Sequence, residues 1–129
     1  MLCSITDCLA VQLIRGEHAI VTVIGASITA GSGSMDGFSW PTYFHNWLLD
    51  AFPSANISFH NAAVVATMSD CMSTCHSSHI PKHTDLVIVE YAVNDIPRTV
   101  QGMSLMDNKE RRPMERLLRR TPANLQWSF

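Results

Sequence analysis

The strongest constraint on the fold is a run of apolar, mostly β-branched residues near the start of the chain. Residues 19–24 read Ala-Ile-Val-Thr-Val-Ile and are almost continuously apolar. Such a run is typical of a strand buried on both faces, as in a parallel sheet covered by helices. It stops abruptly at Gly25-Ala-Ser-Ile-Thr-Ala-Gly31, and a glycine- and serine-rich loop follows as far as Gly37. The pattern predicts a central strand that opens into a loop at one edge of a sheet.

The rest of the sequence alternates between predicted helices and strands. Strands are predicted at 56–60 and 85–91, and helices at 8–15, from Ser39 to Pro53, at 69–78 and at 110–120. Residues 124–129 either begin a further strand or are unrelated to the sheet. The helix after Ser39 places five apolar residues on one face: Trp40, Phe44, Trp47, Leu48 and Ala51. This alternation predicts a flavodoxin-like three-layer α/β/α domain with a parallel sheet.

Composition and charge narrow the functional classes. The chain has 129 residues, 47% apolar and 16% charged, which is typical of one globular domain. Its net charge of −2 gives no reason to expect a nucleic-acid partner. Between Asp107 and Arg120, six basic residues stand against three acidic ones, a pattern more typical of a solvated helix face than of an RNA- or lipid-facing helix.

Membrane insertion and secretion leave no clear mark on the sequence. No stretch approaches the roughly 20 apolar residues of a membrane span. The segment from Met1 to Ile14 is interpreted as a helix rather than a signal peptide, because Asp7 interrupts it and no basic segment precedes it. The four cysteines match no small disulfide framework, so the compartment stays undetermined.

In such sheets, active sites and ligand-binding sites lie at the carboxyl ends of the strands. Those places hold Ser27, the segment 61–69, and Asn94 with Asp95. By position alone, Ser27 is either an exposed nucleophile or a turn serine that bonds its own backbone. The nucleophile elbow G-x-S-x-G does not fit because Thr29 replaces its last glycine, and neither a P-loop nor a dinucleotide fingerprint fits this loop.

The three segments together resemble the motif blocks of SGNH (GDSL-type) ester hydrolases. Residues 24–31 resemble the first block, 61–69 the second and 91–95 the third, in the family's order. The resemblance runs from about Gly16 to Pro97, within a single partial domain over 1–129. It implies an esterase, lipase or acetylesterase that needs no metal or organic cofactor and acts on a small-molecule, carbohydrate or lipid ester.

The resemblance also implies roles for individual residues. Ser27 would attack the ester carbonyl, and its own N–H would help to bind the oxyanion. Ala66, where the family usually has glycine, would add a backbone N–H, and Asn94 would add its side-chain amide. Gly25, Asn61 and Asp95 would support the site, with Asn61 as a strand-end cap and Asp95 orienting its turn through Asx-type hydrogen bonds.

The family's acid–base pair is missing from the sequence. A serine needs an adjacent base, and the family supplies it from an Asp-x-x-His block after the asparagine block. No aspartate here has a histidine three residues on, and all six histidines precede Asn94: 18, 45, 60, 76, 79 and 83. The general base is therefore unknown, and whether the chain is an active enzyme is left open.

This gap leads to further expectations. The domain is expected to be incomplete at its C-terminal side, which would leave the strand at 85–91 as an exposed sheet edge able to associate with other chains. One alternative function is a non-catalytic binding module of the same fold. Another is a metal-binding protein that uses a stripe recurring every four residues: Cys71, Cys75, His79 and His83.

Overall fold

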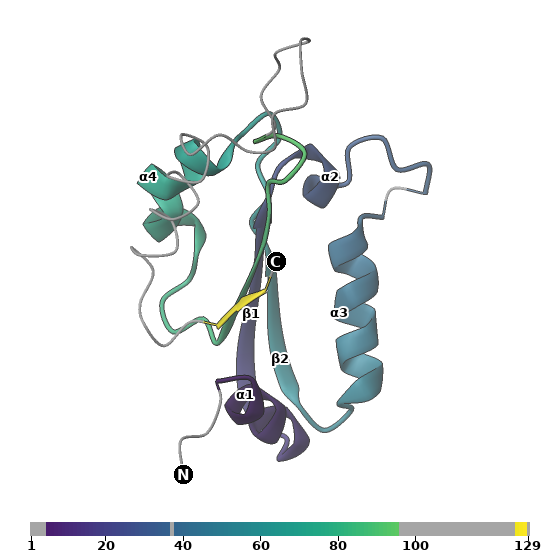
Figure 1. The fold of residues 1–129 in the computed structure, drawn as a ribbon. Coiled ribbons are helices and arrows are strands. Elements are labelled where there is room, and N and C mark those ends of the chain that lie inside the picture. Colours follow the sequence, from purple (N-terminus) through teal and green to yellow (C-terminus); the bar gives the residue numbers. More distant parts are fainter. Residues whose placement is uncertain (1–4, 37, 96–125, 129) are drawn as a thin grey trace.

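A computed structural model describes residues 5–36, 38–95 and 126–128 of the chain (Figure 1). It has the predicted alternation of helices and strands, with these bounds: α1 (Ile5–Ile14), β1 (His18–Gly25), α2 (Ser27–Ala30), α3 (Trp40–Ala51), β2 (Asn56–Asn61), α4 (Ser69–His79), β3 (Leu86–Glu90) and β4 (Gln126–Ser128). The predicted helix at 110–120 lies outside the described residues. The short helix α2, which immediately follows β1, was not predicted.

The strands form one sheet in the order β2-β1-β3-β4, and every neighbouring pair is parallel. β1 is central, as its apolar run predicts. Its Val21 is in register with Phe59 of β2 on one side and with Leu86 of β3 on the other. A 2-1-3-4 order is the beginning of the flavodoxin-like arrangement, so the predicted fold class is confirmed.

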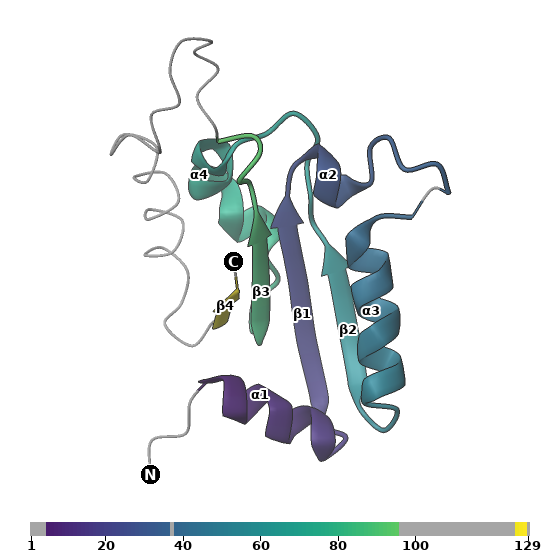
Figure 2. The same ribbon diagram turned by 45° about the vertical axis from the view of Figure 1, so that its right-hand side comes forward.

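Helices cover both faces of the sheet (Figures 1 and 2). On the face of α1 and α3, buried residues Leu13, Ala19, Val21 and Leu48 form one core cluster. On the face of α4, a second cluster includes Ile24, Met72, Ile80, Val87, Val89 and Tyr91. Because successive side chains of a strand point to opposite faces, β1 and β3 each contribute to both clusters. The result is the expected three-layer arrangement.

The expectation that the strand at 85–91 forms an unpaired edge is wrong for three of the five residues of β3. β4 pairs with β3 at Leu86, Val87 and Ile88. Of the two interpretations left open for 124–129, a strand is the one observed. Association of chains through a bare β3 edge is thus not supported along these three residues.

The predicted apolar face of α3 is only partly correct. Leu48 and Pro41 are buried, whereas Ala51 is exposed and Trp47 is 57% exposed. The Trp47 ring instead stacks beside Phe44, with 5.8 Å between ring centroids, and lies edge-on to Phe52 at 6.5 Å. The sheet covers α3 from one side only, so the buried stripe is narrower than the sequence pattern.

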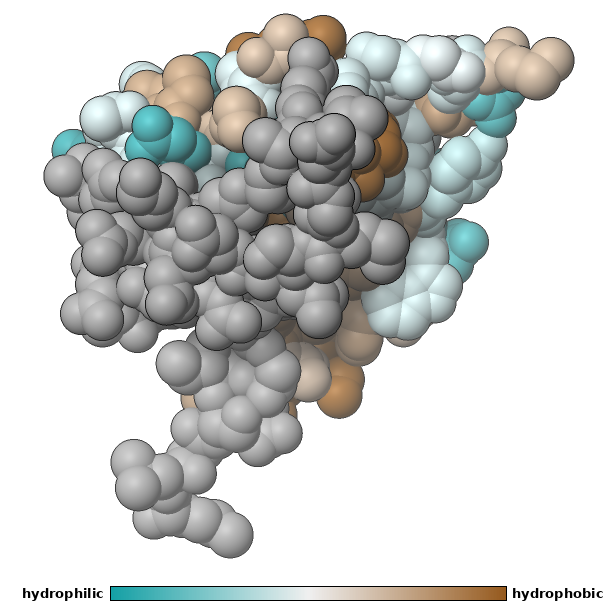
Figure 3. All heavy atoms as spheres, turned by 45° about the horizontal axis from the view of Figure 1, so that its top comes forward, coloured by the Kyte–Doolittle hydropathy of each residue, from teal (hydrophilic) through white to brown (hydrophobic). Residues whose placement is uncertain are grey.

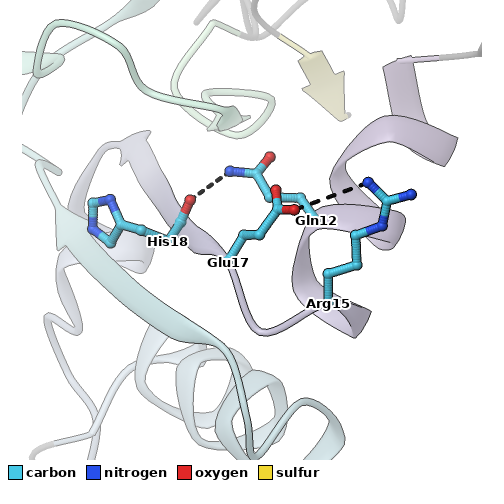
Figure 4. A network of polar contacts seen from close by, with 4 residues as sticks. All are labelled: Gln12, Arg15, Glu17 and His18. Carbon is cyan, nitrogen blue, oxygen red and sulfur yellow. Dashed lines mark hydrogen bonds and ion pairs between the residues drawn. The ribbon is translucent and has the colours of Figure 1, made fainter.

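At the amino ends of the strands, side chains form hydrogen bonds with backbone groups of neighbouring elements. Gln12 of α1 donates from Nε2 to the carbonyl of His18 at 2.5 Å (Figure 4). Asp85 accepts the N–H of Ile20 on Oδ2 at 2.8 Å, which joins the start of β3 to β1. The ion pair of Arg15 and Glu17 spans 4.0 Å between two exposed side chains, so its contribution to stability is small.

Within the described residues, no helix is both long and apolar enough to cross a membrane.

Candidate active site

Three chain segments emerge together at the carboxyl ends of β1, β2 and β3. The first is α2, which begins at Ser27 two residues after β1 ends. The second is the loop from Asn61 to the start of α4, and the third is the turn that contains Asn94 and Asp95. Figures 1 and 2 agree that these segments lie at the same end of the sheet. The topology therefore brings the three motif blocks to one edge.

Gly25 lets the first segment fold tightly against its neighbours. A Cβ atom at Gly25 would lie 2.3 Å from Thr29 Oγ1 and 2.7 Å from the backbone oxygen of Glu90. No side chain fits between a rigid strand and the first turn of α2 at such distances. Glycine at this position thus fixes how closely the turn of Ser27 approaches β3.

Thr29 holds this turn in place and is fully buried. Its hydroxyl donates to Glu90 Oε2 at 3.0 Å, and its carbonyl accepts from Asn61 Nδ2 at 3.1 Å. Asn61 also accepts the N–H of Ala63 on Oδ1 at 3.1 Å, in agreement with its predicted place at a strand end. One residue therefore ties the segment of Ser27 to both neighbouring strands.

Thr29 and Glu90 were not among the residues singled out from the sequence. In the sequence, Thr29 is notable only because it breaks the G-x-S-x-G pattern. Glu90 is a polar residue at the end of an otherwise apolar strand, which is the one sequence signal for a buried polar contact. Its partner Thr29 lies 61 positions away, so the sequence does not reveal the pair.

Ala66 lies in a turn of the second loop with φ +60°, in the left-handed region. Alanine there costs roughly 1–2 kcal/mol relative to its right-handed conformations. The surrounding loop is held by Val64, whose N–H donates to the carbonyl of Gly25 at 3.0 Å, and by the Thr67 hydroxyl, which donates to the carbonyl of Val64 at 2.5 Å. Ala66 thus has the conformation that glycine favours, at the position where the resemblance to SGNH hydrolases predicts a glycine.

Asn94 and Asp95 form a tight turn after β3. Both of their N–H groups donate to the carbonyl of Tyr91, at 3.0 and 2.9 Å. The Asp95 carboxylate does not make the predicted Asx-type bonds within this turn in the described part of the chain. Its Oδ1 instead accepts the N–H of Ser69 at 3.0 Å, at the N-terminus of α4. A carboxylate is favourable there because the helix dipole is positive at that end.

The groups at this edge that make no hydrogen bond among the described residues include the Ser27 hydroxyl, the Ala66 N–H and the Asn94 side-chain amide. The buried hydroxyls of Ser69 and Tyr91 are likewise without a partner there. Ser27 is partly exposed, as is Asn94. Thr29, Asn61 and Asp95 instead use their side chains to hold the loops together. A hydroxyl and two N–H donors are therefore available to a ligand at one edge of the sheet.

None of the six histidines makes a hydrogen bond to Ser27. His18, at the amino end of β1, pairs its Nε2 with Ser58 Oγ at 2.9 Å. His45 on α3 stacks on Phe59, with 4.6 Å between ring centroids. Within the described residues, the structure gives Ser27 no base.

The stripe of cysteines and histidines does not form a metal site. α4 ends at His79, and His83 lies beyond it in a left-handed conformation with φ +65°. Among residues 5–36, 38–95 and 126–128, no group of three or more histidine, cysteine or acidic side chains could hold a metal ion. Burial and the neighbouring Cys71 thiol raise the pKa of Cys75, which disfavours the thiolate that a metal needs. The metal-binding alternative therefore gains no support.

Two esterases of known structure have the same arrangement. Over 98% of this chain, a two-domain esterase (CEX) active on acetylated mannans superposes with a TM-score of 0.80 at 20% identity. AlinE4, an SGNH-hydrolase family esterase, matches 81% of the chain with a TM-score of 0.59 at 24% identity. The chain has the SGNH-esterase fold.

The extent of these matches is also informative. The chain spans 33% of the two-domain esterase and 53% of AlinE4. The two-domain esterase has also been co-crystallized with mannopentaose, and in that form it matches 95% of this chain at 22% identity. No protein-family model and no curated protein matches the sequence. The SGNH fold is thus established by structure, over part of the length of each esterase.

Proposed function

We propose that the chain carries the nucleophile and oxyanion half of an SGNH-type ester hydrolase, within a single partial domain. Ser27 Oγ attacks the ester carbonyl carbon and loses its proton to a base. The carbonyl oxygen becomes an oxyanion, which accepts hydrogen bonds from the N–H groups of Ser27 and Ala66 and from the Asn94 amide. The alcohol then leaves with a proton, and water releases the acid from the acyl-serine.

The observation that carries this proposal is the set of three unengaged groups at one sheet edge. Ser27, Ala66 and Asn94 come from three separate loops, yet each has a free hydroxyl or N–H within the described residues. Meanwhile Gly25, Thr29, Asn61 and Asp95 hold those loops by packing or hydrogen bonds. The alternative interpretation of Ser27, a turn serine, expects its hydroxyl to bond the nearby backbone. No such bond is formed among the described residues.

Turnover by these residues alone is expected to be slow, because no histidine contacts Ser27. An unassisted serine hydroxyl is a weak nucleophile at neutral pH. This observation favours a second candidate function, a binding module that retains an ester pocket without hydrolysing its ligand. The two candidates share the pocket and differ in the reactivity of Ser27.

We infer a carbohydrate ester as the substrate class. Support comes from the two-domain esterase of the same fold, which is active on acetylated mannans. An acetyl ester needs donors for its carbonyl oxygen but no long acyl channel, because its acyl part is a single methyl group. Lipid and other small-molecule esters remain the alternative substrates.

Added base tests the proposal directly. Hydrolysis of p-nitrophenyl acetate is measured over a range of imidazole concentrations for the native chain and for Ser27→Ala, since imidazole also hydrolyses this ester by itself. We expect equal rates without imidazole and a native rate that exceeds that of Ser27→Ala as imidazole rises. Equal rates at every imidazole concentration, in folded proteins, would refute a nucleophilic Ser27 and favour the binding module.

A further inference from the structure

An exposed aromatic pair lies near the candidate site: Phe38 in the loop that joins α2 to α3, and Tyr43 in the first turn of α3. Phe38 is 54% exposed and Tyr43 is 57% exposed, so neither ring serves the core. Their ring centroids are 6.3 Å apart and the rings meet at 65°, an edge-to-face arrangement. The two rings therefore form an ordered aromatic surface in contact with solvent.

Asp36 fixes this pair. Its Oδ1 accepts the N–H of Phe38 at 3.1 Å, and its Oδ2 accepts the Tyr43 hydroxyl at 2.5 Å. These hydrogen bonds, Tyr43's first, lower the pKa of Asp36, whereas the carboxylate raises the pKa of Tyr43. Asp36 is thus ionised at neutral pH, and each of its oxygens keeps a lone pair for a further donor.

The surface lies at the edge that carries Ser27. Its loop begins at Gly31, the residue after α2, and returns at Ser39 to the start of α3. A Cβ atom at Gly31 would lie 3.0 Å from the Ser39 Cβ, so the two ends of the loop are in close contact. Figures 1 and 2 show the loop extending outward from α2 at the end of the sheet where the three motif segments emerge.

The charges around the pair limit what it can bind. No lysine or arginine occurs between Arg15 and Lys82, so an anionic group would meet Asp36 with no cation from this part of the chain. A long acyl chain would bury an ionised carboxylate against hydrocarbon, which is costly. Figure 3 is turned to bring this end of the molecule forward, and its coloured surface mixes pale, brown and teal groups. A neutral polyhydroxy ring satisfies both constraints, because its C–H face packs on aromatic rings and its hydroxyls donate to a carboxylate.

We propose that Phe38, Tyr43 and Asp36 form a subsite for a neutral sugar residue of the substrate. The sugar packs on the two rings and donates a hydroxyl to Asp36, while its ester lies toward Ser27. This inference rests on the proposed function for the position of the ester, but the binding of the sugar does not require Ser27 to react.

Titration with mannopentaose and cellopentaose, followed by NMR of the labelled protein, tests the subsite. We expect saturable binding with a dissociation constant on the order of millimolar, and at least a roughly tenfold weakening in Phe38→Ala and in Tyr43→Ala. The matched control is Trp47→Ala, which removes an aromatic residue of the same exposure from the same helix as Tyr43 and should leave binding unchanged. Tyr43→Phe keeps the ring but loses the bond to Asp36 and should have an intermediate effect.

The outcomes separate the two proposals. Binding that persists in Ser27→Ala but is lost in Phe38→Ala supports the subsite even if Ser27 proves unreactive. Absence of saturable binding, or equal weakening by Trp47→Ala, would overturn the subsite and leave the hydrolase proposal standing. Binding to phosphatidylcholine vesicles that requires Phe38, without binding to either oligosaccharide, would overturn it in favour of a lipid surface.

Discussion

The two ends of the central strands are built from similar residues but use them differently. At the amino end, Asp85 bonds to Ile20, the Thr22 and Thr84 hydroxyls meet at 3.2 Å, and Gln12 closes the turn to His18. At the carboxyl end, Thr29, Asn61 and Asp95 make equivalent bonds, yet Ser27, Ala66 and Asn94 keep free groups in the described residues. The side chains named at the first end stabilise the fold, whereas the second end is where we propose that free donors meet a ligand.

Removing one free donor should have the largest effect. Asn94→Ala is expected to slow the reaction of Ser27 with a fluorophosphonate by roughly 10²–10³-fold, since one oxyanion donor is lost. Unfolding free energy should change by less than about 0.5 kcal/mol, because the side chain has no partner. Asn56→Ala, at the amino end of β2, is the control and should change neither quantity. An unchanged labelling rate in Asn94→Ala would remove Asn94 from the oxyanion site.

Adding a side chain at Gly25 should disrupt the packing at the carboxyl end of the central strands. Gly25→Ala places a methyl group 2.7 Å from a backbone oxygen, and we expect a loss of about 3 kcal/mol in unfolding free energy by urea denaturation. Gly33→Ala is the comparison, since Gly33 has φ +84° and open space around it. It should cost only about 1 kcal/mol for the left-handed backbone. Equal losses in the two variants would show that the close approach at Gly25 is not needed.

Alkaline pH should test the buried end of β3. Burial raises the pKa of Tyr91 to about 12 from its ordinary 10.0. A folded pKa above the unfolded one stabilises the protonated fold, so this contribution is complete below pH 10 and is lost as pH rises from about 10 to 12. The unfolding free energy of the native chain should fall by up to about 2–3 kcal/mol over this range because of Tyr91, and Tyr91→Phe should lack this fall. If the native chain and Tyr91→Phe had identical profiles of unfolding free energy against pH, the raised pKa of Tyr91 would be contradicted.

Two buried threonines allow the ends to be compared directly. Thr29→Val and Thr22→Val each delete one buried hydroxyl, and each should cost about 1–2 kcal/mol of stability. Only Thr29→Val should also slow Ser27 labelling, because Thr29 holds the turn of Ser27, and Thr29→Ser should restore the rate. Equal slowing in both variants would mean that labelling reports stability alone.

The smallest expected effect is a gain. Ala66→Gly relieves the left-handed alanine and should stabilise the fold by about 1 kcal/mol in urea denaturation. Ala63→Gly, in the same loop but without positive φ, should be neutral or destabilising. A loss of stability in Ala66→Gly would show that the loop does not hold φ near +60°.

Sequence reasoning predicted the parts of this molecule that depend on local patterns. The β-branched run at 19–24 predicted the central strand, and the order of strands and helices predicted the sheet. It failed where contacts between distant segments decide the outcome. The pairing of β4 with β3, the exposure of Trp47 and the bond from Asp95 to Ser69 all depend on which neighbour packs nearby. Thr29 and Glu90 were missed for the same reason.

In the candidate site, too, local sequence patterns predicted some residues, whereas contacts between distant segments were missed. The motif blocks named Ser27, Ala66 and Asn94, and the parallel topology brings their loops to one edge. Their roles in catalysis stay predictions, because no base forms a hydrogen bond with Ser27 within the described residues. The sequence pattern named Gly25 and Asn61 as supports but missed Thr29, which bonds Glu90 and Asn61 and so completes the framework that holds the loops.

The central claim is that Ser27 is the reactive group at the carboxyl edge. Labelling with a fluorophosphonate in the presence of imidazole, followed by peptide mapping with mass spectrometry, tests it most directly. We predict a single modified site at Ser27, and no modification in folded Ser27→Ala. Equal modification of other serines, or unchanged labelling in Ser27→Ala, would contradict the claim.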